Sequence, residues 1–161
     1  MSLAFVNFTC AARASTDQNS AYVEYVYDGD TVNIRQLGSE YKLRLSDIDA
    51  PELNQPSGKI ARRALMNLCM NQPIIVVISG EDKYHRQLGN LQCNQTNTSQ
   101  YQVEHGYAWH YAQYSHDPGP VQAEHDAKEN KRGLWAEPDP TPPWVWRKSH
   151  PYYYKIMQKI K

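Results

Sequence analysis

A chain of 161 residues is the size of one domain, and it buries roughly two-thirds of the surface that its unfolded form exposes. It therefore needs neither a metal nor a disulfide merely to fold. Lys and Arg together number 17, as do Asp and Glu, so the formal net charge is zero with His neutral. This balance argues against a protein that is held to nucleic acid by bulk charge alone.

The first fourteen residues are mostly apolar and end in Ala12-Arg13-Ala14, a small-x-small pattern of the kind that precedes signal-peptide cleavage. A basic segment ahead of the apolar run is missing. Residues 1–20 are therefore either the remnant of a secretion signal or an ordinary disordered or docked N-terminus. The first interpretation predicts a secreted or periplasmic protein. No other apolar run approaches the length of a membrane span, so no membrane partner is expected.

Two cysteines, Cys69 and Cys93, lie beyond this N-terminal segment. An even pair in an exported chain is typical of one disulfide, whose loop-closure entropy would stabilise the fold by about 3 kcal/mol. Two buried free thiols are the alternative, because the sequence does not show how far apart the two residues lie in space.

Residues 21–48 alternate between apolar and polar positions with period two, which predicts strands. Turn-forming residues interrupt the pattern at Asp28-Gly29-Asp30 and at Gly38-Ser39, so a three-strand meander is expected. In its third strand, Leu43 and Leu45 share the apolar face. Arg44 then points to the opposite side, where a ligand would lie.

A helix is predicted after Pro56, with Ser57 as its N-cap and an apolar face made of Ile60, Ala64, Leu65 and Leu68. Apolar runs at 74–78 and 88–93 predict two more strands. Helical patterns return at 99–105 and 121–132, each followed by a glycine, and prolines between 138 and 143 are expected to end regular structure. Five short strands with inserted and terminal helices indicate an α+β fold, and antiparallel strands of this kind suit a small closed barrel.

Four carboxylates lie at a turn and near a strand end: Asp28, Asp30, Asp49 and Glu52. The meander makes the two strands neighbours, so these side chains can converge. Oxygen-only ligands favour Ca²⁺, Mg²⁺ or Mn²⁺ over zinc. Asp28 is better explained as an Asx-turn residue, and Asp47 as a turn or salt-bridge residue. The pattern indicates a hard-cation site.

Arg44 and Arg86 supply a second kind of chemistry. A guanidinium group offers a planar fork that matches two oxygens of a phosphate, whereas Lys offers only a point charge. Displacement at phosphorus builds negative charge on those oxygens, so two arginines beside a metal site indicate phosphoryl chemistry.

After Trp146 the chain carries only basic charges, at Arg147, Lys148, Lys155, Lys159 and Lys161. This tail is either solvated or an arm that contacts phosphate. Trp144 and Trp146 are expected to pack the tail against the barrel.

Five segments resemble the staphylococcal nuclease (thermonuclease) family in order and spacing: Asp28–Thr31, Arg44–Glu52, Asp82–Gly89, Gly106–Trp109 and Ala123–Trp135. The resemblance covers roughly residues 22–148. It implies a five-stranded OB-fold barrel with about three helices, with a nuclease domain at 21–148 and a basic tail at 149–161. It also implies a Ca²⁺-dependent endonuclease that acts on DNA and RNA and leaves 3′-phosphate ends, without an obligate protein partner and monomeric.

The same resemblance implies a role for each matching residue. Asp30 and Asp49 are similar to the ligands of one Ca²⁺ ion, with the backbone carbonyl of Ala50 beside them. Glu52 is similar to the general base. The remaining matches are the phosphate clamps Arg44 and Arg86, the 5′-phosphate contacts Lys83 and Tyr84, and the aromatic position Tyr114.

This chain departs from the family pattern at three places in the site. One is Ala112, which stands where the family has a second phosphate-side tyrosine, with Tyr111 one position away. Ala50 stands where the family has Thr, a change that leaves a backbone carbonyl in place. His85 replaces a glycine before Arg86, which restricts the backbone and is expected to affect where that arginine points.

Two other functions fit the same barrel. A catalytically silent nucleic-acid-binding module is the first, because OB folds bind single strands without cutting them. Such a module would have lost Glu52, Arg44 or an Asp ligand, and this chain has lost none. A domain whose carboxylates bind Ca²⁺ only for stability is the second, and it gives no reason for Arg44 and Arg86 to accompany them.

Overall fold

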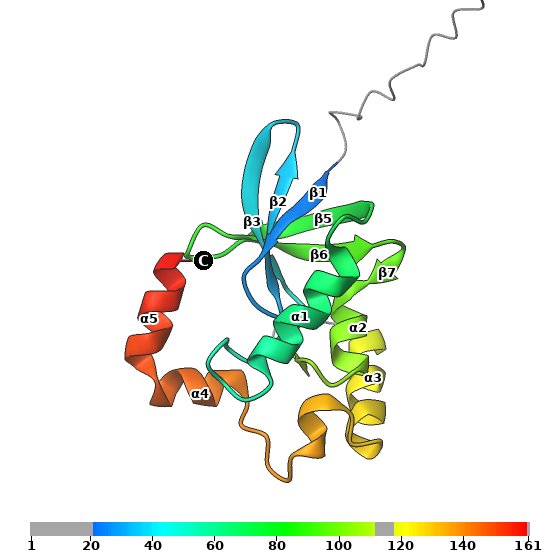
Figure 1. Cartoon of the computed structure of the whole chain (residues 1–161), viewed down its shortest axis with the longest axis vertical. Helices are drawn as coiled ribbons and strands as arrows, with labels where there is room; N and C mark the ends of the chain where they lie inside the picture. The colour runs from blue at the N-terminus through cyan, green and yellow to red at the C-terminus, as the bar shows by residue number, and fades with distance from the viewer. Residues whose placement is uncertain (1–20, 112–117, 161) are drawn as a thin grey trace, which may run out of the picture.

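The computed structural model describes residues 21–111 and 118–160 (Figure 1). The strands are β1 (Tyr22–Val26), β2 (Thr31–Gln36), β3 (Ser39–Leu45), β4 (Ile48–Asp49), β5 (Ile74–Glu81), β6 (Gln87–Cys93), β7 (Thr96–Asn97) and β8 (Trp109–His110). The helices are α1 (Gly58–Cys69), α2 (Thr98–Glu104), α3 (Pro118–Glu129), the 3₁₀ helix η1 (Gly133–Ala136), α4 (Pro143–Ser149) and α5 (Pro151–Ile160). Within these parts of the chain, none of the helices has the length and apolar content needed to span a bilayer.

The α+β class is confirmed, and the main sheet has the strand order β1-β2-β3-β6-β5. Neighbouring strands are antiparallel except β3 and β6, which run parallel. The predicted closed barrel was wrong in one respect: in the described residues β1 and β5 form the two edges of the sheet and do not pair with each other. Whether the two edge strands pair depends on the curvature of the whole sheet, and the alternation within each strand does not encode that curvature.

The expected number of helices was also too small, since the described residues contain five α-helices. The three predicted helices correspond to α1, α2 and α3. Pro143, which was expected to end regular structure, instead begins α4, and α5 likewise begins at a proline, Pro151. Proline is favoured in the first turn of a helix because the amide hydrogen it lacks would have no partner there.

The core lies between the sheet and α1. Val32, Ile34, Leu43 and Leu45 of the meander are fully buried, as the period-two pattern predicts. The apolar face predicted for α1 was partly wrong. Its buried stripe consists of Ala61, Ala64, Leu65 and Cys69, whereas Ile60 is 55% exposed. Ser57 precedes the helix with a positive φ of 67° and its side chain makes no capping hydrogen bond.

Cys69, at the end of α1, and Cys93, at the end of β6, are joined by a disulfide. Both residues are fully buried, and their Cα atoms lie 5.1 Å apart. The bond connects the helix that covers the core to β6, an interior strand of the sheet.

Replacing Cys69 and Cys93 together by alanine is expected to lower the free energy of unfolding by about 3 kcal/mol. The two cysteines are 24 positions apart, and closing the loop between them removes entropy from the unfolded chain, which the variant regains. Urea denaturation of the parent and the variant measures the difference. The parent treated with reductant is the matched control and should lose a similar amount; equal stability of all three samples would contradict the prediction.

The turn between β1 and β2 packs closely against Ala50, which follows β4, and against Ala61 of α1. A side chain at Gly29 would place its Cβ 2.6 Å from the Cβ of Ala50 and 2.7 Å from that of Ala61, so only glycine fits. Buried Gln102 donates to the carbonyl of Gly29 at 2.7 Å and to that of Ala61 at 3.1 Å. The turn is thereby held next to the segment that carries Asp49.

Candidate active site

Asp30 and Asp49, 19 positions apart in the sequence, meet at one end of the sheet. Asp30 Oδ2 accepts a hydrogen bond from the Ala50 amide at 2.8 Å, and its Oδ1 accepts from the Thr31 hydroxyl at 2.9 Å. Asp28 Oδ1 accepts from the Asp30 amide at 3.0 Å, which is the predicted Asx-turn contact. Both carboxylates predicted as cation ligands therefore lie close together, although Asp30 comes from the turn before β2 and Asp49 from β4.

Arg44 bridges these two acids. Its Nε lies 3.3 Å from Asp30 Oδ1, and its Nη2 lies 3.1 Å from Asp49 Oδ1. Nη1 also donates to the carbonyl of Ile48 at 2.8 Å and to that of Leu45. Burial alone would lower the pKa of Arg44, but the charges of Asp30, Asp49 and Asp28 raise it above its ordinary value. Arg44 is thus a buried cation with a fixed orientation.

Glu52 lies three residues after Asp49 in the turn that precedes α1, and it is buried. Gln55 shapes this turn, because its amide donates to the Glu52 carbonyl at 2.8 Å while its side chain accepts from the Glu52 amide at 3.2 Å. Burial of a carboxylate requires a partner of opposite charge. Glu52 Oε1 has one in Arg147, at 3.3 Å.

Arg147 of α4 is a site residue that the sequence analysis did not place. Its guanidinium group binds Asp49 with two contacts, Nη1 to Oδ1 at 3.0 Å and Nη2 to Oδ2 at 2.8 Å. Burial alone would lower the pKa of Arg147, but the hydrogen bonds and charges of Asp49, Glu52 and Asp30 raise it well above its usual range. In the sequence, the only indication of Arg147 was the basic tail, which fitted both a solvated segment and an arm that contacts phosphate.

Arg86 lies in the loop between β5 and β6. Asp82 orients it: Oδ2 of Asp82 accepts from Arg86 Nε at 2.8 Å and lies 2.7 Å from Nη2, while Oδ1 accepts from the Arg86 amide at 3.1 Å. His85 adopts a positive φ of 62°, a conformation that favours glycine, and its side chain is 89% exposed. The departure at His85 is accommodated without loss of the Asp82–Arg86 pair.

The Asp82 carboxyl is expected to titrate below its ordinary pKa of 3.8. Burial alone would raise this pKa, but hydrogen bonds from the Arg86 amide and guanidinium, and from the Tyr84 amide, lower it. Because the folded-state pKa is the lower one, the pair stabilises the loop above the unfolded pKa and is lost as pH falls through the folded value. A ¹³C NMR titration of the carboxyl carbon measures the midpoint, and a midpoint above 3.8 would contradict this assignment.

The structure contains a pocket of about 560 Å³ at this site. It is lined by the predicted residues Asp30, Arg44, Asp49, Glu52, Lys83, Tyr84 and Arg86, together with Arg147 and Tyr154 from the C-terminal helices. Burial and a hydrogen bond with Tyr84 raise the pKa of Tyr154 to about 12. Tyr114 lies outside the described residues. One pocket thus brings together the carboxylates and both predicted arginines.

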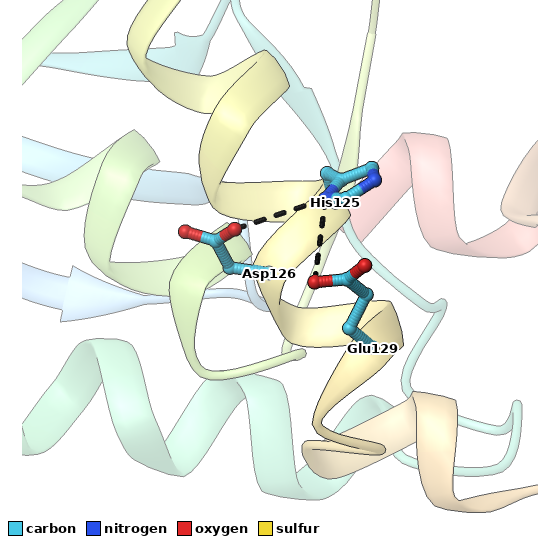
Figure 2. A group of neighbouring side chains, drawn as sticks. All are labelled: His125, Asp126 and Glu129. Carbon is cyan, nitrogen blue, oxygen red and sulfur yellow. Dashed lines mark ion pairs between the residues drawn. The ribbon is translucent and has the colours of Figure 1, made fainter.

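A separate group of possible metal ligands lies on the outer surface of α3 (Figure 2). His125 Nδ1 is 3.8 Å from Asp126 Oδ1 and 3.7 Å from Glu129 Oε2, and Asp126 also accepts from Gln122 at 2.8 Å. In the part of the chain that the structure describes, this is the one group whose three ligand atoms lie within 4.8 Å of one another. It is an exposed set of helical ion pairs, and it does not include the predicted ligands.

Fold and site together define a class of protein: an α+β domain with the strand order of an OB fold, carrying buried carboxylates and arginines in one pocket. Residues 42–137 match the family model described as staphylococcal nuclease homologue. This chain belongs to that family. The matched region includes Arg44, Asp49, Glu52 and Arg86, and it ends before α4.

Similar proteins occur in bacteria and plants. An uncharacterized endonuclease of Escherichia coli O157:H7 is 37% identical over 123 residues, which cover 76% of this chain and 80% of that protein. An uncharacterized endonuclease of Haemophilus influenzae is 35% identical over 142 residues, covering 88% and 80% respectively. A probable staphylococcal-like nuclease of Oryza sativa is 36% identical over 112 residues, covering 70% of this chain and 34% of that longer protein.

Proposed function

We propose that this protein is a Ca²⁺-dependent endonuclease that hydrolyses phosphodiester bonds of DNA and RNA with low sequence specificity and leaves 3′-phosphate ends. Membership of the nuclease family and the endonuclease relatives support a nuclease in general. The observation that carries the proposal further is the pocket itself, which Asp30, Asp49, Glu52 and Arg86 line together.

The residues present fit a hard divalent cation. Asp30 and Asp49 offer carboxylate oxygens, and the Ala50 carbonyl follows directly in the chain, which is an oxygen-only donor set. In this structure two guanidinium groups already contact these carboxylates, so the site is built to hold positive charge. A bound Ca²⁺ ion would supply Lewis-acid polarisation of a phosphate oxygen and favour ionisation of a nearby water.

Glu52 is the group proposed to handle the attacking water. A buried carboxylate close to the cation site is suited to accept or orient the proton of a water as it attacks phosphorus. Arg44 and Arg86 stabilise the charge that develops on the phosphate oxygens, because each holds its guanidinium group in place before the substrate arrives. Asp82 provides that preorganisation for Arg86, and the acids around it provide it for Arg44.

Lys83 and Tyr84 are proposed to hold a neighbouring phosphate. Both line the pocket from the same loop as Arg86, and the ammonium group of Lys83 lies 5.2 Å from the centre of the Tyr84 ring. An exposed aromatic ring beside cations is suited to a nucleic-acid strand, because stacking tolerates any base.

Incubation with plasmid DNA and Ca²⁺, and separately with EDTA, tests the proposal. Metal-dependent loss of high-molecular-weight DNA is expected, and the fragments should accept a 5′-phosphate from a kinase without prior phosphatase treatment. Retarded migration of DNA without fragmentation would instead identify a silent binding module. Cleavage that is unaffected by EDTA would exclude the proposed metal dependence.

We also propose that the protein acts in a secreted or periplasmic compartment. The Cys69–Cys93 disulfide supports this location, because structural disulfides persist mainly in oxidising compartments. Fractionation of the native host, with an antibody against this chain, would locate the protein directly.

A further inference from the structure

The helices α4 and α5 form a C-terminal arm that runs from the base of the molecule toward the β5–β6 loop (Figure 1). The arm lies beyond the residues that match the family model, yet it contributes Arg147 and Tyr154 to the pocket. Trp144 anchors the arm: its ring centre lies 6.4 Å from that of Trp109 and 6.2 Å from that of Tyr111. Trp146 adds a hydrogen bond from its indole to Asn54 at 3.3 Å.

Asp49 is nearly saturated by guanidinium groups. Each carboxylate oxygen has two lone pairs, about four for the group. Oδ1 accepts from Arg44 Nη2 at 3.1 Å and from Arg147 Nη1 at 3.0 Å, and Oδ2 accepts from Arg147 Nη2 at 2.8 Å. Arg147 therefore uses one lone pair on each oxygen. A cation that binds Asp49 must compete for these positions and must approach a positive charge.

Of the two arginines, Arg147 is the one that can leave. Arg44 is held by the backbone carbonyls of Leu45 and Ile48 in addition to both acids, and only 12% of its side chain is exposed. In the described residues, the polar contacts of Arg147 are to the side chains of Asp49 and Glu52, and 21% of its own side chain is exposed. The aromatic contacts of Trp144 hold the arm in place when the Arg147 side chain turns away.

We propose that Arg147 is a positioning residue of the active site that competes with the divalent cation for Asp49 and Glu52, and so sets the affinity of the site for metal. This inference rests on the proposed function, because it assigns the cation to Asp49. Asp49 and Glu52 both contact Arg147, and Asp30 and Asp49 both contact Arg44. Displacing Arg147 removes one positive charge from this group of buried carboxylates, and a divalent ion would replace that charge.

Replacing Arg147 by glutamine is expected to tighten Ca²⁺ binding about tenfold, a coupling within the usual range between two linked sites. Isothermal titration calorimetry of the full chain, without nucleic acid, measures the dissociation constant. Lys148→Gln is the matched control, because it removes the same charge from the adjacent, exposed position of α4 and should leave the affinity unchanged. Arg147→Lys keeps the charge without the fork and should fall between the parent and Arg147→Gln.

Asp49→Asn separates this inference from the proposed function. If Asp49→Asn abolishes binding and Arg147→Gln binds Ca²⁺ no more tightly than the parent, the competition is refuted while the metal site stands. If neither the parent nor Arg147→Gln binds Ca²⁺ in a manner that depends on Asp49, the proposed function and the inference both fail.

A second test measures the parent protein itself and uses Arg147→Gln only to assign the signals. The guanidinium protons of Arg147, assigned by their loss in Arg147→Gln, should exchange with solvent at least tenfold faster when Ca²⁺ saturates the site. The coupling is reciprocal: if the Arg147 contacts weaken the binding of metal, bound metal must weaken those contacts. An exchange rate that stays constant or falls on addition of Ca²⁺ would overturn the proposal.

Discussion

Replacing Glu52 by glutamine is expected to lower the turnover of DNA about 10²- to 10⁴-fold, the range contributed by a positioned acid–base group. The amide keeps the shape of the side chain but cannot accept a proton from water. Glu52 is buried next to Asp49 and Arg147, so an isosteric change disturbs the packing little. Initial rates on plasmid DNA at saturating Ca²⁺ measure the effect, and the affinity for a short single strand should change much less.

Glu129→Gln is the matched control for this substitution. Glu129 lies on the exposed surface of α3, where the described residues place it in the ion-pair group of Figure 2. Its variant should cleave DNA at the parent rate. A Glu52→Gln protein that folds normally and retains the parent turnover would remove Glu52 from the mechanism.

Replacing Arg44 by alanine is expected to have two effects, because this residue serves both the fold and the chemistry. Turnover should fall about 10²- to 10³-fold through loss of a preorganised donor. Without metal, the free energy of unfolding should also fall by about 3 kcal/mol, because Asp30 and Asp49 lose a buried partner. Urea denaturation in EDTA measures the second effect. Added Ca²⁺ should restore part of the stability but not the turnover.

Arg44→Lys distinguishes charge from geometry at this position. Lysine keeps a positive charge between the acids but cannot bridge both of them and the backbone carbonyl of Ile48 at once. It should therefore retain more stability than Arg44→Ala while its turnover stays low. Parent-like stability of Arg44→Ala in EDTA would show that Arg147 alone neutralises the acids.

Much of the site was predictable because its residues follow local patterns. The alternation in β3 places Arg44 on the face opposite Leu43 and Leu45, and those leucines are fully buried. The turn chemistry of Asp28 and Gly29 brings Asp30 to the end of the same sheet. Each of these features depends on a few consecutive residues and on the pairing of strands that adjoin in the chain.

Arg147 is a site residue that local sequence patterns did not predict. Nothing in the local sequence distinguishes it from Lys148, its neighbour in a basic tail. Its position follows from the packing of Trp144 against Trp109 and Tyr111, which lie more than thirty positions earlier in the chain. The first helical turn of α4 begins at a proline that the sequence analysis took as a break.

The amino-acid sequence by itself determined the α+β class, the meander, the family resemblance and the set of carboxylates and arginines, because strand period, turn chemistry and spacing are local properties. Only the tertiary structure decided that the sheet edges β1 and β5 do not pair in the described residues, and that the C-terminal arm reaches the pocket. It also decided that Arg147 donates hydrogen bonds to both carboxylate oxygens of Asp49. These features join residues far apart in the chain, and the free energy that joins them comes from packing and charge, which a local pattern does not record.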